Sequence, residues 1–321
     1  MSPDQNWHCG EIPPAEQTHA LVPFQGPSAK VVRNIEHLFL FTNFPAHSIA
    51  LQNFPETSTV PTGQEITIDL RASGACWITI DRAQKHNALS RSVLADIAAA
   101  VREAGAQPGT RVVVLTGAGE RFFAAGGDLR DLAGVRDEAA TLAMTDEARG
   151  ALDAIRHCPV PVIGLLNGDA IGGGAELALA CDMRLQAGHA RIGFIQARLG
   201  ITSAWGGGPD LCRLVGSARA MRMMSRSELV GAQQALGMGL ADAVVGDGDE
   251  GSVGADVQAF LDPMLACPPQ VLRGIKAQTS AWRRTGDIET ARAIERRHLV
   301  ETWLHADHWR AAENILSRSA R

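Results

Sequence analysis

The segment Val160-Pro-Val-Ile-Gly-Leu-Leu-Asn-Gly-Asp-Ala-Ile-Gly-Gly-Gly-Ala-Glu-Leu177 decides which fold the chain is expected to adopt. Residues 160–165 form an apolar run, which is typical of a buried parallel strand. Three glycines at 172–174 then open a helix that runs through Glu176 and Leu179. Glycine lets backbone N–H groups approach a ligand without a Cβ in the way, and a helix N-terminus adds positive partial charge. The segment therefore predicts a strand-to-helix turn that presents backbone donors.

A second turn of the same kind lies earlier in the chain. Phe122-Phe-Ala-Ala-Gly-Gly-Asp-Leu129 follows an apolar run at 111–116, which also predicts a buried strand. If both turns face one point, their N–H groups form an oxyanion hole, although tight packing of the glycines explains either turn alone. Nucleotide sites are disfavoured, because Phe122 stands where a dinucleotide fingerprint beginning at Gly117 requires its third glycine, and the Gly-Lys-Ser/Thr of a phosphate-binding loop is absent.

Strands and helices alternate outward from these turns. Two β-rich runs at 66–70 and 76–80 predict a hairpin, and Ser90 predicts the N-cap of a helix. Beyond about residue 208 the chain is expected to be helical, apart from a strand at 243–245. The alternation predicts an α/β fold. We divide the chain into a loosely ordered, proline-rich extension at 1–62, a core at 63–255 and a helical region at 256–321.

Composition limits the classes of function. The net charge of −5 and the lack of a long basic run argue against a nucleic-acid-binding surface, and the absence of tyrosine excludes a tyrosine acid or base. Six scattered cysteines lack metal-ligand spacing, so we expect reduced thiols and no metal site. Neither a targeting peptide nor a membrane-spanning run is found, so we expect a cytoplasmic protein without a membrane partner.

Five motifs resemble the crotonase (enoyl-CoA hydratase/isomerase) superfamily, from about residue 65 to the C-terminus and in that family's order and spacing. They are Arg82-Ala-Gln-Lys-His-Asn-Ala-Leu89, Phe123-Ala-Ala-Gly-Gly-Asp-Leu129, Pro161-Val-Ile-Gly-Leu-Leu-Asn-Gly168, Gly172-Gly-Gly-Ala-Glu-Leu177 and Leu199-Gly200. The resemblance implies a crotonase-type spiral of ββα units with a helical C-terminal region. It also implies an acyl-CoA thioester as substrate, with no metal, flavin or nicotinamide cofactor.

The resemblance further implies particular site residues. The oxyanion donors are expected to be the backbone N–H groups of Gly127 and Gly173, which would stabilise the negative oxygen of a thioester enolate. Trp205 is expected to line the acyl pocket, and Glu176 is expected to be the polar group nearest Cα, where it would orient the substrate or protonate the enolate. Contacts with coenzyme A are expected at Arg82, Lys85, Ala88, Ala124, Ala125 and Leu129, and Lys276 is expected to reach the phosphates.

The choice of reaction depends on two acid–base positions. Hydratases of the family use a glutamate in Gly-Gly-Gly-x-Glu and a second glutamate four residues before a later Leu-Gly glycine. This chain has Glu176 at the first position but Gln196 at the second, and an amide cannot exchange protons as a carboxylate does. Decarboxylation of a methylmalonyl- or ethylmalonyl-type thioester needs no base, so we favour it. The segments 199–207 and 295–303 also look like the ethylmalonyl-CoA decarboxylase branch.

Other interpretations stay open at this point. The chain could hydrate or isomerise an enoyl-CoA, or tailor an acyl group bound to a carrier protein. It could instead be a non-catalytic CoA-binding or scaffold protein. The resemblance implies a homotrimer or a dimer of trimers, with C-terminal helices packing across subunits.

Overall fold

The computed structural model describes residues 59–60, 65–246 and 252–319, all of which belong to one unit of the chain, Asn53–Arg321. The extension predicted at 1–62 therefore lies outside the described residues, apart from Thr59–Val60. The boundary predicted after residue 255 falls inside helix α7 (Ser252–Leu265). Within the described ranges, no helix is both long enough and apolar enough to cross a membrane.

The larger sheet contains seven strands in the order β1-β2-β3-β4-β6-β8-β11 among the described residues. Strands β2 and β3 form the antiparallel hairpin that the sequence predicts, whereas the strands from β3 to β11 run parallel to one another. The bounds are Thr59–Val60 (β1), Ile66–Leu70 (β2), Ala75–Ile80 (β3), Val112–Gly117 (β4), Val162–Leu166 (β6), Met183–Ala187 (β8) and Ala243–Val245 (β11).

The smaller sheet has the order β10-β9-β7-β5, with bounds Phe122–Ala124 (β5), Asp169–Ile171 (β7), Arg191–Gly193 (β9) and Leu229–Gly231 (β10). Three times the chain places one strand in the larger sheet, the next strand in the smaller sheet, and then a helix. These units are β4-β5-α2 (α2 is Glu138–Arg156), β6-β7-α3 (α3 is Gly173–Ala180) and β8-β9-α4 (α4 is Gly207–Val215). The recurrence confirms the predicted ββα units.

The helices begin and end close to the predicted positions. Helix α1 (Arg91–Ala106) starts after Ser90, whose hydroxyl accepts a hydrogen bond from the N–H of Val93 at 3.3 Å. Strand β10 (Leu229–Gly231) pairs with β9 and corrects the prediction, which had no strand there. The later part of the chain is otherwise helical, as expected, and β11 interrupts it at the predicted place. Its helices are α5 (Ser217–Arg226), α6 (Ala232–Gly237), α7, α8 (Pro269–Thr285), α9 (Ile288–Trp303) and α10 (Ala306–Ser319).

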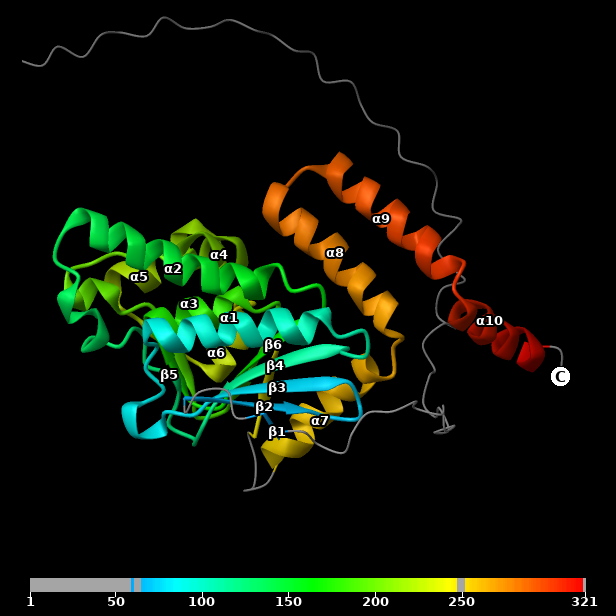
Figure 1. The fold of residues 1–321 in the computed structure, drawn as a ribbon, viewed down its shortest axis with the longest axis horizontal. Helices are drawn as coiled ribbons and strands as arrows, with labels where there is room; N and C mark the ends of the chain where they lie inside the picture. Colours follow the sequence, from blue (N-terminus) through cyan, green and yellow to red (C-terminus); the bar gives the residue numbers. More distant parts are fainter. Residues whose placement is uncertain (1–58, 61–64, 247–251, 320–321) are drawn as a thin grey trace, which may run out of the picture. The chain divides into compact units, whose positions relative to one another are not determined.

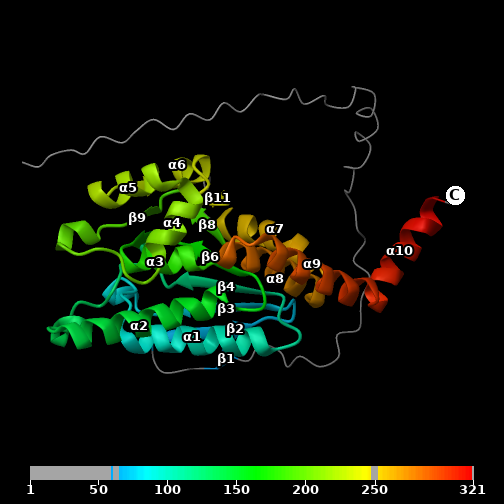
Figure 2. The same ribbon diagram turned by 90° about the horizontal axis from the view of Figure 1, so that it is seen from above.

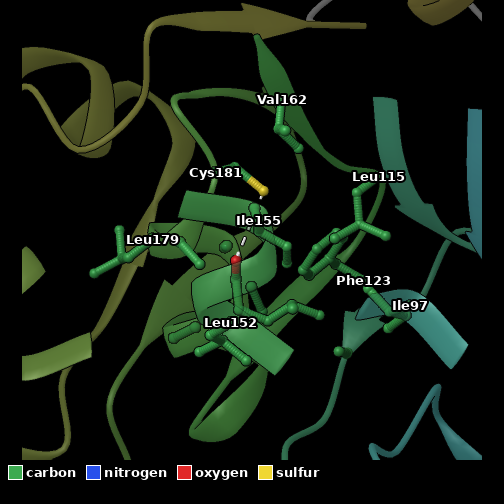
Figure 3. Close-up of a cluster of buried hydrophobic side chains, with 14 of the residues drawn as sticks. Ile97, Leu115, Phe123, Leu152, Ile155, Val162, Leu179 and Cys181 are labelled. Carbon is green, nitrogen blue, oxygen red and sulfur yellow. Dashed lines mark hydrogen bonds between the residues drawn. The ribbon is translucent and has the colours of Figure 1, made fainter. Parts of the chain in front are cut away.

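Strand β4 is buried on both faces, which explains its uninterrupted apolar sequence. Val113 and Leu115 belong to the hydrophobic core that includes α1, α2 and α3, whereas Val112 and Val114 belong to a second cluster that includes α7 and α8. Figure 1 shows α1 and α2 on one side of this sheet and α7 on the other. In Figure 3, Leu115 and Phe123 point into the first core.

Two ion pairs tie helix α8 to the rest of the unit. The Nζ of Lys276 lies 2.5 Å from both carboxylate oxygens of Asp182, and the guanidinium of Arg283 lies 3.0 Å from a carboxylate oxygen of Asp210. The side chains of Lys276 and Asp210 are each only 3% exposed. Helix α9 then packs along α8, as Figures 1 and 2 both show.

Candidate active site

The two glycine turns follow neighbouring strands of the smaller sheet. Strands β5 and β7 run parallel, with Ala124 opposite Ala170, so the turns leave the same edge of the sheet. Their backbones touch there, because a Cβ placed on Gly126 would lie 3.3 Å from the amide nitrogen of Gly173. Gly126 also has a φ of +101°, a conformation that L side chains rarely adopt. Both the close approach and the backbone angle therefore favour glycine at 126.

Each turn presents a backbone N–H group that has no acceptor among the described residues. The chain on either side of Gly127 is fixed, because the N–H of Leu89 donates to the carbonyl of Gly126 and the N–H of Asp128 donates to the carbonyl of Leu89. Gly173 is the first residue of α3, where a helix leaves its N–H groups unpaired. Neither Gly127 nor Gly173 donates its N–H to another residue in the part of the chain that the structure describes. The arrangement offers two free donors beside the α3 N-terminus.

The indole ring of Trp205 lies against both glycines. Its Cη2 atom is 3.5 Å from the position of a Cβ on Gly127 and 2.7 Å from the position of a Cβ on Gly173. A Cβ on Gly173 would come within 2.3 Å of Cζ3, closer than atoms can pack, so only glycine lets the ring rest on this backbone. The tryptophan is 8% exposed. It therefore forms a buried wall next to the two donors.

Glu176 holds the turn that carries this tryptophan. The residue lies in the first turn of α3 and is 2% exposed. Its Oε2 accepts hydrogen bonds from the backbone N–H groups of Trp205 and Gly207, each at 2.9 Å. Its Oε1 accepts a hydrogen bond from the Nε2 of Gln196 at 3.0 Å. The carboxylate thus joins three segments that are far apart in the sequence.

Burial shifts the acid–base behaviour of Glu176. Loss of solvent raises the pKa of its carboxyl above the ordinary value, although the hydrogen bonds from Gly207, Trp205 and Gln196 oppose the shift. Gln196 lies in the short 3-10 helix Gln196–Leu199, and its Oε1 is buried without a hydrogen-bond partner among the described residues. An amide therefore lies within hydrogen-bond distance of Glu176. The hydratases of the family that this chain resembles are expected to have a carboxylate at that position.

The residues expected to contact coenzyme A come from two segments that lie side by side. The N–H of Ala125 donates to the carbonyl of His86, and the N–H of Leu89 donates to that of Gly126. Ala88, Ala125 and Leu129 are at least partly accessible, whereas Ala124 is fully buried.

The three predicted cationic residues occupy different environments. Arg82 is buried, donates to the carbonyl of Ala88 and forms an ion pair with Asp128 at 2.9 Å, so it braces the turn from inside. Lys85 is exposed, and its Nζ lies 3.7 Å from Glu65. Lys276 is paired with Asp182 next to the first residue of β8, and the structure does not bring it together with the others.

Sequence reasoning missed two arginines that also hold the Trp205 turn. Both lie on α2: Arg149 donates to the carbonyl of Ala204 at 2.6 Å, and Arg156 donates to the carbonyl of Trp205 at 3.3 Å. Arg156 also pairs with Asp210 at 3.0 Å. The only signal in the sequence was the spacing of seven residues, which puts the two arginines on one face of a helix. That spacing does not reveal which loop they reach.

Comparisons with known proteins agree on the kind of protein this chain resembles. The family model described as enoyl-CoA hydratase/isomerase matches residues 71–314. Ethylmalonyl-CoA decarboxylase of Rattus norvegicus is 28% identical over 253 residues, covering 79% of this chain and 82% of that protein. YngF of Bacillus subtilis, named as an enoyl-CoA hydratase/isomerase, is 31% identical over 242 residues, covering 75% and 90%. The crystal structure of an enoyl-CoA hydratase from Bacillus anthracis superposes with a TM-score of 0.73 at 29% identity, covering 79% of this chain and 97% of that one.

Proposed function

This chain belongs to the enoyl-CoA hydratase/isomerase family, and from that premise we propose that it decarboxylates a malonyl-type CoA thioester through a thioester enolate. Whatever its exact reaction, the chain is an acyl-CoA-processing enzyme of the crotonase superfamily. Methylmalonyl-CoA and ethylmalonyl-CoA are the substrates that the proposal favours.

The proposed reaction needs an oxyanion hole more than it needs a base. The bond between Cα and the substrate carboxylate breaks, CO2 leaves, and the bonding electrons pass into the thioester, whose oxygen becomes negative. The N–H groups of Gly127 and Gly173 would donate to that oxygen. One such donor contributes typically about 3–4 kcal/mol to lowering a barrier. A proton then adds to Cα and completes the acyl-CoA product.

The observation that carries the proposal is the pairing of Gln196 with Glu176. Hydration uses two carboxylates, one to activate water and one to handle the Cα proton, and here an amide donates to the remaining carboxylate at 3.0 Å. A second carboxylate at 196 would repel the carboxylate of a malonyl-type substrate, whereas an amide does not. The similarity to ethylmalonyl-CoA decarboxylases of several vertebrates supports the same choice.

Hydration or isomerisation of an enoyl-CoA is the second candidate. Its support is Glu176, a buried carboxyl with a raised pKa that could serve as an acid or base, together with the similarity to proteins named enoyl-CoA hydratase. Carrier-bound acyl groups are a further possible substrate, because the oxyanion donors recognise only the thioester.

The experiment is a panel of thioesters followed by mass spectrometry. Ethylmalonyl-CoA and methylmalonyl-CoA should yield butyryl-CoA and propionyl-CoA with one CO2 each, and in D2O each product should carry one deuterium at Cα. Crotonyl-CoA serves as the hydratase control and the matching pantetheine thioester as the control for carrier-bound substrates. If both malonyl thioesters survive while crotonyl-CoA is hydrated, the second candidate replaces the first.

We extend the proposal to a homotrimer or a dimer of trimers. Helices α9 and α10 support it, because large apolar side chains on both are exposed in this single chain. They include Leu299, Val300 and Trp303 on α9 and Trp309 on α10, and Leu304 between the two helices is exposed as well. Light scattering on the purified protein gives the subunit number directly, and a monomer at micromolar concentration would contradict this part of the proposal.

A further inference from the structure

The turn around Trp205 is built to hold its side chain in one place. Glu176 accepts both backbone N–H groups at 205 and 207, while Arg149 and Arg156 donate to the carbonyls at 204 and 205. Charged side chains from two helices therefore fix the four-residue turn from both sides. A loop that merely filled space would not need three ionic groups aimed at its backbone.

The ring that this turn positions fills an apolar space beside the oxyanion donors. Behind Trp205 lies a cavity of about 10 Å³, which is room for at most one water molecule. Its apolar lining comes from α1, α2, the residue before Ser90 and the segment after the first glycine turn: Leu89, Leu94, Leu132, Met144 and Ala148. The ion pair of Arg91 with Glu147 completes the lining. The indole ring lies against both Gly127 and Gly173 and also lines this cavity, so a thioester bound at the two glycines would have the ring beside its acyl group.

We propose that Trp205 limits the acyl group to a short alkyl chain, and that Glu176 is a positioning residue that anchors the tryptophan. The inference rests on the proposed function only for the assumption that a thioester binds at the two glycines. Three hydrogen bonds already engage the oxygens of Glu176, and each of them helps to fix the turn or its neighbour Gln196. Its role is to hold the wall of the acyl site rather than to touch the substrate.

The test measures binding, so that it does not depend on which reaction occurs. Acetyl-, butyryl-, hexanoyl- and octanoyl-CoA are titrated calorimetrically into the wild-type protein and its variants. Wild-type protein should bind butyryl-CoA at least as tightly as octanoyl-CoA. In Trp205→Ala the ratio of octanoyl to butyryl affinity should rise by about 10- to 100-fold, because four additional methylenes become buried. A ratio within twofold of wild type overturns the proposal, as does a wild-type preference for octanoyl-CoA.

A second variant covers the case in which Trp205→Ala does not fold. Leu132 also lines the pocket, with its Cδ1 3.1 Å from the position of a Cβ on Gly127. Leu132→Ala should shift the affinity ratio in the same direction by a smaller factor, and an unchanged ratio counts against the proposal.

The anchoring role of Glu176 has its own pair of variants. In Glu176→Gln the amide oxygen can accept from Trp205 and Gly207. The new amide nitrogen takes the place of the oxygen that accepts from Gln196, and it can donate to the unpaired oxygen of Gln196 once that amide turns over. This variant should keep the wild-type chain-length preference. Glu176→Ala frees the turn and should lose that preference. Loss of the chain-length preference in both variants overturns the anchoring role. If the wild-type protein shows the chain-length preference but releases no CO2 from either malonyl thioester, only the proposed reaction is overturned.

Discussion

Replacing Gln196 by glutamate would place a second carboxylate beside Glu176 in a buried part of the site. Two full charges separated by the present 3.0 Å repel each other by about 5 kcal/mol at an effective dielectric constant of about 20. That cost is a large fraction of the stability of an ordinary domain. We therefore expect the variant to keep one proton on the pair at neutral pH, with the pKa of one carboxyl raised further than burial alone raises that of Glu176.

The sign of the pH dependence follows from linkage. A carboxyl whose folded-state pKa is raised causes no penalty below its ordinary pKa, where it is protonated in both states, and destabilises the fold as pH rises through the raised value. The melting temperature of Gln196→Glu should therefore approach that of wild type near pH 4.5 and fall increasingly below it toward pH 8. The uncharged variant Gln196→Met controls for the lost hydrogen bond and should show no such trend.

Two assays complete this test. Thermal melts between pH 4.5 and 8 measure the stability difference, and the thioester panel measures the reaction. We expect release of CO2 from ethylmalonyl-CoA to fall at least tenfold, a barrier increase of about 1.4 kcal/mol, and hydration of crotonyl-CoA to rise above the wild-type rate. A stability difference that is equal at pH 5 and pH 8 would refute the proximity of the two side chains. Unchanged decarboxylation would refute the reason given for an amide at 196.

Three further predictions concern stability and the oxyanion hole. Glu176→Ala leaves two buried backbone N–H groups without acceptors and should lower the free energy of unfolding by about 2–5 kcal/mol, measured by urea denaturation. Gly126→Ala forces a side chain into a left-handed conformation 3.3 Å from the amide of Gly173, so thioester turnover should fall by about 100-fold or more while coenzyme A still binds. Asp182→Asn leaves the buried ammonium of Lys276 without its carboxylate and should cost about 3–5 kcal/mol, and the double variant that adds Lys276→Met should recover much of that loss.

The features that depend on local sequence could be predicted. The apolar run of β4 predicts burial on both faces, because no polar residue alternates with the apolar ones, and Ser90 predicts the start of α1 because a hydroxyl is needed to cap it. The positions of the two glycine turns followed from the same reasoning. Both turns leave the carboxyl ends of buried strands, and the strands place them together.

The features that depend on distant partners could not be predicted. Trp205 was expected to line the acyl pocket, but the sequence did not indicate that Glu176, 29 residues earlier, would hold its backbone. Lys276 was expected to reach phosphates, yet its partner Asp182 lies 94 residues away. A sequence does not distinguish a lysine in an internal ion pair from a lysine that binds a ligand. The two differ only in which segment of the chain packs against the lysine.

The attachment of α8 through Lys276 and Arg283 determines where the polypeptide can be shortened. A protein that ended before Pro269 would leave the Asp182 carboxylate without the ammonium group of Lys276. It would also lack Arg283, one of the guanidinium partners of Asp210. A protein that stopped in the turn at Gly286 would keep both attachments and dispense with the apolar surfaces of α9 and α10. A shortened chain should therefore end no earlier than that glycine, and ending there would also remove the contacts that α9 makes along α8.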